Sequence, residues 1–188
     1  QPSLDPFQKY ENSYKNTIES ALVNLSNTNT DVDLLIWPES PLPYLNSSQD
    51  MKKLLARTNN LPVILSGGWE YSNGDLQNVM SVLGEKQTYA KQHLVLFGEY
   101  IPFEGLLRGL IEFFDMPMST IKAGNTNQEL FTINGRQVLG LICFDIAFPL
   151  SYIKQSKKAD FIVNISNDTW FGSSYGPYQH LQIVRARA

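Results

Sequence analysis

The apolar positions of this chain follow two patterns, one typical of surface helices and one typical of buried strands. Large apolar residues recur every three or four positions over residues 7–25, with Glu, Lys, Asn and Ser between them. This spacing predicts an amphipathic helix, and residues 48–58 predict a second one. Short continuous apolar runs between the helices predict strands covered on both faces. Three such runs lie at residues 34–37, 62–66 and 160–165.

Turn residues separate further strands. Asn134-Gly135 stands between two apolar runs, which is a tight-turn signal for a hairpin. Residues 77–83 and 87–90 are predicted to form the arms of another hairpin, and Gly67-Gly68 is expected to close the strand before it. The alternation of helices with buried strands predicts an α/β layered fold.

One apolar stretch ends in the only cysteine of the chain. It predicts a buried strand running through Cys143 into a sharp turn, where Asp145 caps a helix and Pro149 is tolerated in the first turn. A thiol at such a turn lies near the positive end of a helix, a location that favours a thiolate. Free cysteine is also among the most buried residue types, so this strand alone favours a small core residue.

Composition restricts the classes of function. The chain has 188 residues and a formal net charge of −3, which suits one domain with a sizeable core. No run of Lys and Arg exceeds a pair, which argues against nucleic acid as a partner. The single cysteine excludes an internal disulfide. No apolar run approaches the ~20 residues that span a bilayer, so composition by itself indicates a globular domain.

Two other strand ends carry candidate chemistry. Glu39 follows the apolar run at residues 34–37, within a segment holding three prolines in six residues. Prolines cannot continue a ladder, so Glu39 is a candidate general base in a rigid loop. Lys91 follows the arm at residues 87–90 and opens a loop that mixes aromatic and charged side chains, a composition typical of functional loops. A capping or surface glutamate and a plain surface lysine are the alternatives.

Glu39, Lys91 and Cys143 thus each stand at the end of a predicted strand. In layered α/β folds such ends converge at one edge, where sites form. Grouped there, Glu39 would take the thiol proton, Cys143 would attack an acyl carbon, and Lys91 would stabilise the oxyanion and favour the thiolate. His93 and His180 lack metal-ligand spacing, so no metal is assigned and each is expected to be solvated or hydrogen-bonded in the core.

Residues 106–114 predict a short, strongly apolar helix, and the loop after it is unusually apolar. Core packing explains this segment. A surface that faces lipid or a partner explains it equally well. The two interpretations stay open.

Three short segments carry the candidate acid, amine and thiol, in this order along the chain: Pro38-Glu39, Tyr89-Ala90-Lys91 and Ile142-Cys143-Phe144-Asp145. In these segments the chain resembles the nitrilase superfamily of carbon–nitrogen hydrolases and its Glu–Lys–Cys triad. More narrowly, it is similar to the nitrilase-type domain of bacterial apolipoprotein N-acyltransferases, and the similarity runs nearly end to end. Four segments carry that narrower resemblance, at residues 36–40, 91–102, 166–172 and 176–182.

The resemblance implies a nitrilase-like α-β-β-α layered sandwich that is truncated at both ends. Residues 1–188 would form one catalytic domain without the first strand, the C-terminal strands and the flanking transmembrane helices of the family. It also implies a place at the bacterial cytoplasmic (inner) membrane, with the domain on the periplasmic face.

The resemblance further implies a reaction. Cys143 would take an acyl chain from a membrane phospholipid as a thioester, with Glu39 as general base and Lys91 as oxyanion stabiliser. The acyl group would pass to the N-terminal cysteine amine of an apolipoprotein that carries a diacylglyceryl group. The family uses no cofactor, and no nucleic acid is involved.

Further residues are carried over from the same family. Glu99 and Asp145 would be supporting acids, and the side chains lining an acyl pocket would be Phe97, Tyr100, Phe144 and Trp170. An apolar pocket suits a lipid chain. The chain departs from the family pattern twice, with Asp145 where Glu is usual and Leu96 where Pro is usual. The alternatives are a soluble amidase of the nitrilase family that hydrolyses small amides, and a non-catalytic extracytoplasmic module that binds lipid or lipoprotein.

Overall fold

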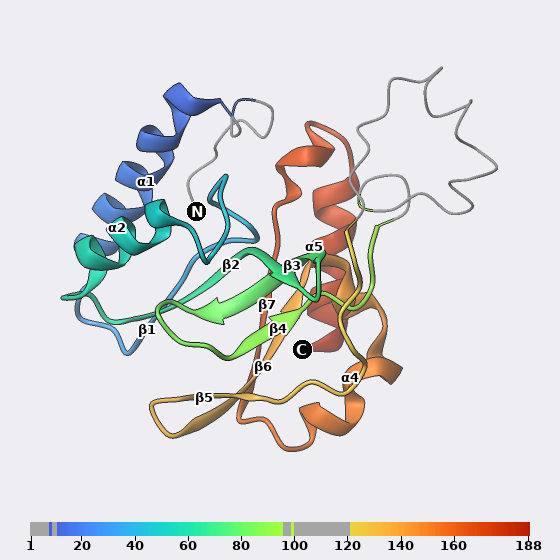
Figure 1. Ribbon diagram of the computed structural model, residues 1–188. Helices are drawn as coiled ribbons and strands as arrows, with labels where there is room; N and C mark the ends of the chain where they lie inside the picture. Colours follow the sequence, from blue (N-terminus) through green and yellow to red (C-terminus); the bar gives the residue numbers. More distant parts are fainter. Residues whose placement is uncertain (1–7, 9–10, 96–98, 100–120) are drawn as a thin grey trace.

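The computed structural model describes residues 8, 11–95, 99 and 121–188, which form both helices and strands (Figure 1). The elements are α1 (Asn12–Asn27), β1 (Leu34–Ile36), α2 (Gln49–Thr58), β2 (Val63–Ser72), β3 (Asp75–Val82), β4 (Thr88–Ala90), β5 (Phe131–Ile133), β6 (Arg136–Ile142), η2 (Cys143–Ala147), α4 (Pro149–Ser156), β7 (Phe161–Ile165), η3 (Asp168–Phe171) and α5 (Gly176–Arg187). The elements η2 and η3 are 3₁₀ turns. The apolar segment at residues 106–114 lies outside the described residues.

The described strands form two sheets, one in the order β1-β2-β3-β4 and one in the order β5-β6-β7. The pairs β1–β2 and β6–β7 are parallel, and the other pairs are antiparallel. Buried side chains of both sheets share one core, including Leu65 and Met80 from the first sheet and Val138 and Ile142 from the second. Figure 1 shows α1 and α2 on one side of the sheets and α4 and α5 on the other. The predicted α/β layered fold is confirmed.

The two N-terminal helices follow their predicted apolar stripes, except that α1 begins at Asn12 and Leu25 at the end of its stripe is 48% exposed. Ile18 and Leu22 of α1 are buried and pack with Met51 and Leu54 of α2. The hydroxyl of Ser48 caps α2 by accepting a hydrogen bond from the backbone N–H of Met51 at 3.1 Å. Helix α1 therefore covers α2 and the first sheet, as its periodicity predicts.

Three expectations about the strands are wrong. Strand β2 does not end at Gly67-Gly68 but continues to Ser72, because these glycines lie in close contact with neighbouring segments. Ile36 in β1 is 51% exposed and Phe161 in β7 is 41% exposed. Both strands lie at sheet edges, where the neighbouring layer does not cover them fully. In the middle strand β6, by contrast, residues 138–142 are all buried.

Candidate active site

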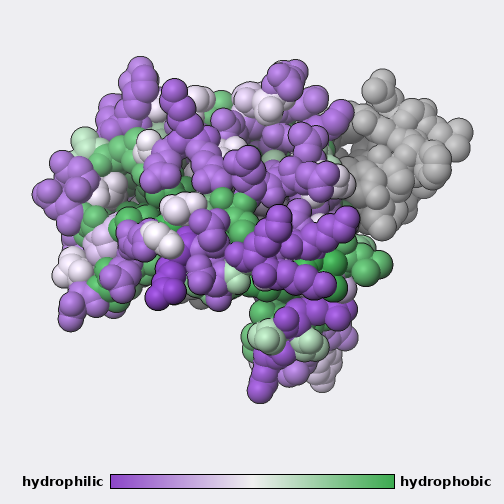
Figure 2. Space-filling view, turned by 90° about the horizontal axis from the view of Figure 1, so that it is seen from below, coloured by the Kyte–Doolittle hydropathy of each residue, from purple (hydrophilic) through white to green (hydrophobic). Residues whose placement is uncertain are grey.

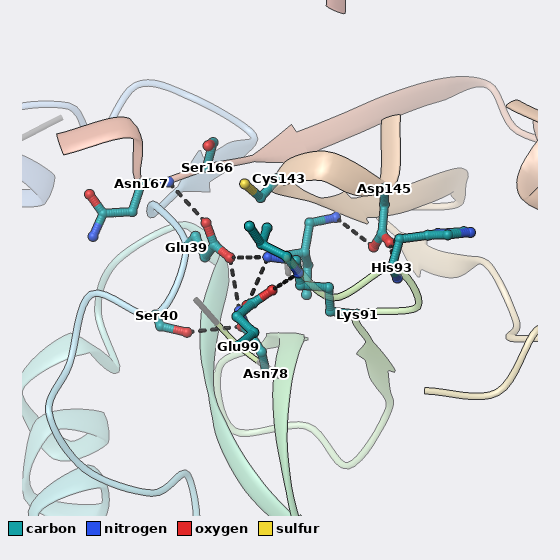
Figure 3. A network of polar contacts seen from close by, with 12 residues as sticks. Glu39, Ser40, Asn78, Lys91, His93, Glu99, Cys143, Asp145, Ser166 and Asn167 are labelled. Carbon is teal, nitrogen blue, oxygen red and sulfur yellow. Dashed lines mark hydrogen bonds and ion pairs between the residues drawn. The ribbon is translucent and has the colours of Figure 1, made fainter. Parts of the chain in front are cut away.

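Three strand ends carry the candidate chemical groups, and the structure brings them together. Glu39 follows β1, Lys91 directly follows β4, and Cys143 directly follows β6. Figure 3 shows these side chains pointing toward one another from three separate segments of the chain. The three strand ends therefore converge at one place, as expected.

The position of Glu39 depends on a glycine in the neighbouring strand. The backbone N–H of Gly67 donates to the carbonyl of Pro38 at 3.2 Å. A Cβ atom on Gly67 would overlap the backbone of Glu39 and Ser40. Only glycine lets the loop after β1 approach the sheet this closely, so Gly67 serves the site and is not a turn residue.

The carboxylate of Glu39 is buried and accepts hydrogen bonds at both oxygens. Its Oε1 accepts from Lys91 Nζ at 3.0 Å and from Asn78 Nδ2 at 2.8 Å. Its Oε2 accepts from the backbone N–H of Asn167 at 3.0 Å. The hydroxyl of Ser40 donates to Asn78 Oδ1 at 2.9 Å and orients that amide. Glu39 is therefore not a surface or helix-capping residue.

Lys91 lies in the interior, with only 2% of its side chain exposed. Its backbone N–H donates to the carbonyl of Asn78 at 2.9 Å, which continues the pairing of β3 with β4. Its ammonium lies between two carboxylates, 3.0 Å from Glu39 Oε1 and 2.9 Å from Glu99 Oε1. Glu99 Oε2 in turn accepts from the backbone N–H of Val95 at 2.8 Å. The alternative of a plain surface lysine is wrong.

The charge of Lys91 is stabilised by its neighbours. Burial alone would lower the pKa of Lys91, but the negative charges of Glu39 and Glu99 outweigh burial and raise it. The amine is therefore a permanent cation at neutral pH, available to stabilise developing negative charge.

Cys143 is the first residue of η2 and has a left-handed backbone with φ of +51°. Its side chain is partly buried. Burial and the charge of Glu39 raise the pKa of the thiol to about 12, and they outweigh Lys91 and a hydrogen bond with Ser166. The expectation that this location favours a thiolate is wrong for the resting site, because η2 is a single short turn and desolvation is the larger effect.

Asp145 occupies a second polar network, on the other side of the nucleophile turn (Figure 3). Its carboxylate is fully buried. Its contacts are the hydroxyl of Tyr89 at 3.0 Å, the backbone N–H groups of His93 at 2.7 Å, Gln92 at 3.2 Å and Ile142 at 3.3 Å, and the ring of His93 at 3.1 Å. Burial raises the pKa of Asp145, while these donors oppose the rise. Asp145 therefore caps η2 and joins that turn to the segment after Lys91.

Sequence reasoning did not find a third cluster, formed by Asp168, His180 and Ser166. His180 Nδ1 lies 2.9 and 3.0 Å from the two carboxylate oxygens of Asp168, and Nε2 lies 3.2 Å from the carbonyl oxygen of Cys143. Ser166 Oγ donates to Asp168 Oδ1 at 2.6 Å. His180 is core-bonded as expected, and its separation of 37 residues from Cys143 hides the contact in the sequence.

Cys143, Asp168 and His180 each offer a sulfur, oxygen or nitrogen atom, and these atoms lie within 4.8 Å of one another. Three such groups are close enough to share one cation. The local spacing of the histidines gave no sign of this grouping. Because hydrogen bonds already engage both ring nitrogens of His180, we assign no metal here.

The carried-over apolar residues are only partly described. Phe144 is 40% exposed and meets Phe148 edge to face at 5.3 Å between ring centroids. Phe148 also stacks on His93 at 4.0 Å. Phe97, Tyr100 and Leu96 lie outside the described residues, as does the side chain of Trp170 in η3.

Apolar side chains are also exposed on the two helices behind the nucleophile turn. On α4 these are Leu150 and Ile153, and on α5 they are Tyr178 and Leu181. The face seen in Figure 2 is mostly hydrophilic, with hydrophobic side chains in smaller groups. Among the described residues, no helix has the length and apolar character that a bilayer crossing requires.

Comparison with known proteins places the chain in a sequence family. Residues 10–188 match the family model of the carbon–nitrogen hydrolases. An apolipoprotein N-acyltransferase from Pseudomonas aeruginosa is 40% identical over 182 residues, which cover 88% of this chain and 34% of that protein. One from Vibrio vulnificus is 34% identical over 186 residues, which cover 88% of this chain and 36% of that protein. The chain thus spans about a third of the length of these curated relatives.

Solved structures share the fold at low sequence identity. A carbon–nitrogen hydrolase superfamily protein from Xanthomonas campestris, solved with an arsenic adduct in its active site, has a TM-score of 0.65 at 15% identity over 92% of this chain and 65% of that chain. An amidase from Nesterenkonia, solved with a covalent adduct at its active-site cysteine, has a TM-score of 0.58 at 15% identity over 95% of this chain and 66% of that chain. These likenesses establish the fold.

Proposed function

This chain belongs to the carbon–nitrogen hydrolase family, and from that premise we propose that it is an acyltransferase domain in which Cys143 carries the acyl group. The proposed donor is a membrane phospholipid, and the proposed acceptor is the α-amine of the N-terminal cysteine of an apolipoprotein. Relatives named apolipoprotein N-acyltransferase over 88% of the chain support this choice. The observation that carries it is the ammonium of Lys91, buried between Glu39 and Glu99 beside Cys143.

In the first step the thiol of Cys143 attacks the ester carbon of the phospholipid. Because the resting thiol is protonated, Glu39 accepts its proton as the carbon–sulfur bond forms. Lys91 stabilises the negative charge that develops on the carbonyl oxygen. The ester carbon–oxygen bond then breaks, and Glu39 returns the proton to the departing glycerol oxygen. The products are a thioester on Cys143 and a lysophospholipid.

In the second step the acceptor amine attacks the thioester carbon. Glu39 takes a proton from the amine, the carbon–sulfur bond breaks, and the proton passes to the sulfur of Cys143. The products are an amide on the lipoprotein and the free thiol. Asn78 and Asn167 hold the carboxylate of Glu39 in one orientation through both steps.

Exposed apolar side chains on the residues that follow Cys143 support a lipid substrate. Phe144 directly follows the nucleophile and leaves 40% of its surface exposed. Leu150 and Ile153 add exposed apolar area on the following helix. We propose that Phe144, with Phe97, Tyr100 and Trp170, contacts the acyl chain. The domain would act at the periplasmic face of the bacterial inner membrane, as part of a longer membrane protein.

The test is to detect the intermediate on the full-length protein in detergent or membranes. Incubation with phospholipid should add one acyl mass to the peptide that contains Cys143, and neutral hydroxylamine should remove it. Cys143→Ala should abolish the adduct, and Glu39→Gln should reduce its rate of formation by at least ~10². Glu85→Gln, which changes an exposed turn carboxylate, is the matched control and should leave the rate unchanged.

The fate of the acyl group separates the proposal from its alternatives. Transfer to an amine-bearing diacylglyceryl peptide, with little release to water, supports an acyltransferase. Release of free fatty acid at the same rate without the peptide would indicate a hydrolase. An adduct that persists in Cys143→Ala, or none in the wild type, would refute the assignment of the nucleophile.

A further inference from the structure

His180 lies 37 residues after Cys143, contacts its carbonyl, and takes part in neither of the proposed steps. We propose that His180, held as a cation by Asp168, is a positioning residue that fixes the backbone of the nucleophile turn. The proposal rests on the role proposed for Cys143. Through His180, α5 would hold Cys143, which has a left-handed backbone, in its reactive geometry.

The hydrogen-bond geometry determines which protons the His180 ring carries. A carbonyl oxygen only accepts, so Nε2, at 3.2 Å from the oxygen of Cys143, must carry a hydrogen. The carboxylate of Asp168 also only accepts when ionised, and both its oxygens lie within 3.0 Å of Nδ1. Its Oδ1 already receives the hydroxyl proton of Ser166. Both ring nitrogens therefore donate, and the ring is an imidazolium.

The electrostatic surroundings favour the same charged form. The hydrogen bond that the His180 ring donates to Asp168 raises the pKa of His180 and outweighs burial, and the carbonyl of Cys143 and the charge of Glu39 add to the rise. The pKa of Asp168 is lowered, because its hydrogen bonds with His180 and Ser166 outweigh its burial. The acidic groups that face His180 thus come from η3 and from the loop after β1.

The nucleophile turn needs such support. Cys143 has φ of +51°, a region that non-glycine residues adopt only when their surroundings hold them there. A charged donor makes a stronger hydrogen bond to the Cys143 carbonyl than a neutral one. The imidazolium has no free lone pair, so it does not act as the base for the thiol. That role stays with Glu39.

Two substitutions of His180 separate positioning from simple packing. In His180→Gln the amide nitrogen can reach the position of Nε2 and keep a donor on the Cys143 carbonyl. In His180→Asn the amide can reach only Asp168, near the position of Nδ1. We expect kcat to fall by ~10² in the Asn variant with KM unchanged, and by less than ~10-fold in the Gln variant. Equal losses in both variants, or no loss in either, would overturn the proposal.

The pH profile provides a second measurement. The wild-type kcat should fall as pH rises through the raised pKa of His180, because the neutral ring loses one of its two donors. The Gln variant should lack this alkaline fall. Gln179→Ala, at an exposed position adjacent in α5, is the control and should keep both the wild-type kcat and its profile.

A spectroscopic test does not depend on the reaction. With ¹⁵N-labelled histidine, both ring nitrogens of His180 should show the protonated chemical shift at pH 7, and these signals should disappear in His180→Gln. A neutral ring at pH 7 would overturn this proposal and leave the acyltransferase proposal standing. A protonated ring in a protein that forms no thioester would refute the role of Cys143, and with it the positioning role of His180, and would leave only the charge state of His180 standing.

Discussion

Two buried polar networks flank the nucleophile turn, and they balance their charges in opposite ways. Around Lys91, one cation is shared by the carboxylates of Glu39 and Glu99, so titratable side chains compensate one another. Around Asp145, one carboxylate is held by a tyrosine, a histidine and backbone N–H groups. Backbone donors keep their protons at any pH near neutrality. The second network is therefore suited to hold structure, and the first to move a proton.

The first network should also be the more fragile of the two. Removing one member of a buried ion pair leaves an uncompensated charge, which costs more than the loss of a neutral hydrogen bond. In the Lys91 network, Lys91 and its partner Glu39 are also proposed participants in the reaction. Substitutions in the Lys91 network should therefore lower both stability and activity, whereas substitutions in the Asp145 network should lower stability with little loss of activity.

Lys91→Met is expected to have the largest effect. The variant keeps the length of the side chain but leaves two buried carboxylates without their cation, at a cost of about 3–5 kcal/mol in unfolding free energy. Loss of the oxyanion stabiliser should lower kcat by ~10²–10³. Urea denaturation and thioester formation measure the two effects. Lys122→Met, at a 66% exposed lysine, is the control, and equal effects in both variants would contradict the comparison.

Gly67→Ala tests whether the backbone holds the Lys91 network in place. The added methyl group overlaps the backbone of the Glu39 loop, so Glu39 should shift and kcat should fall by ~10². Overpacking should cost about 1–3 kcal/mol in stability. The atoms nearest to an added Cβ on Gly68 belong to the side chain of Asn46, so Gly68→Ala should retain more activity at similar stability. If kcat falls more in Gly68→Ala than in Gly67→Ala, the role given to Gly67 is wrong.

Asp145→Asn should separate stability from catalysis. Asparagine keeps the shape of the side chain, but its NH₂ group replaces one of the two oxygens that accept hydrogen bonds from the surrounding donors. This mismatch should cost about 1–3 kcal/mol in unfolding free energy. Since Asp145 contacts Tyr89, His93 and backbone N–H groups and not the reacting groups, kcat should fall by no more than ~10-fold. Asp75→Asn, at a side chain 53% exposed, controls for the change of charge. A catalytic loss as large as that of Lys91→Met would remove the distinction between the networks.

The smallest predicted effect is that of Glu39→Gln on the reactivity of the Cys143 thiol. The thiol should react faster in this variant, although acyl transfer should be slower. Glu39 helps to raise the pKa of Cys143 to about 12, so wild-type alkylation by iodoacetamide should be slow at pH 8 and increase with pH. Removing the negative charge lowers this pKa, so alkylation at pH 8 should become a few times faster while acyl transfer is lost. Slower alkylation in the variant would contradict the electrostatic account.

Much of the local structure could be predicted because it depends on residues close in sequence. The apolar stripe that includes Ile18 and Leu22 predicts α1, and Ser48 caps the start of α2. Asn134-Gly135 adopts positive φ at both residues and joins β5 to β6. Pro149 begins α4 as predicted, but Asp145 caps the separate turn η2 and not α4, whose N-cap is Phe148.

Sequence by itself thus determined the helices α1 and α2, the hairpins β3–β4 and β5–β6, the α/β class and the three strand ends that carry Glu39, Lys91 and Cys143. Tertiary structure alone decided which strands lie at an edge, that Gly67 makes room for Glu39, that Asn78 and His180 contact the site, and that the thiol is protonated at rest. Helix and turn preferences arise within a few residues. Burial and the pKa of a thiol are sums over neighbours that only folding brings together.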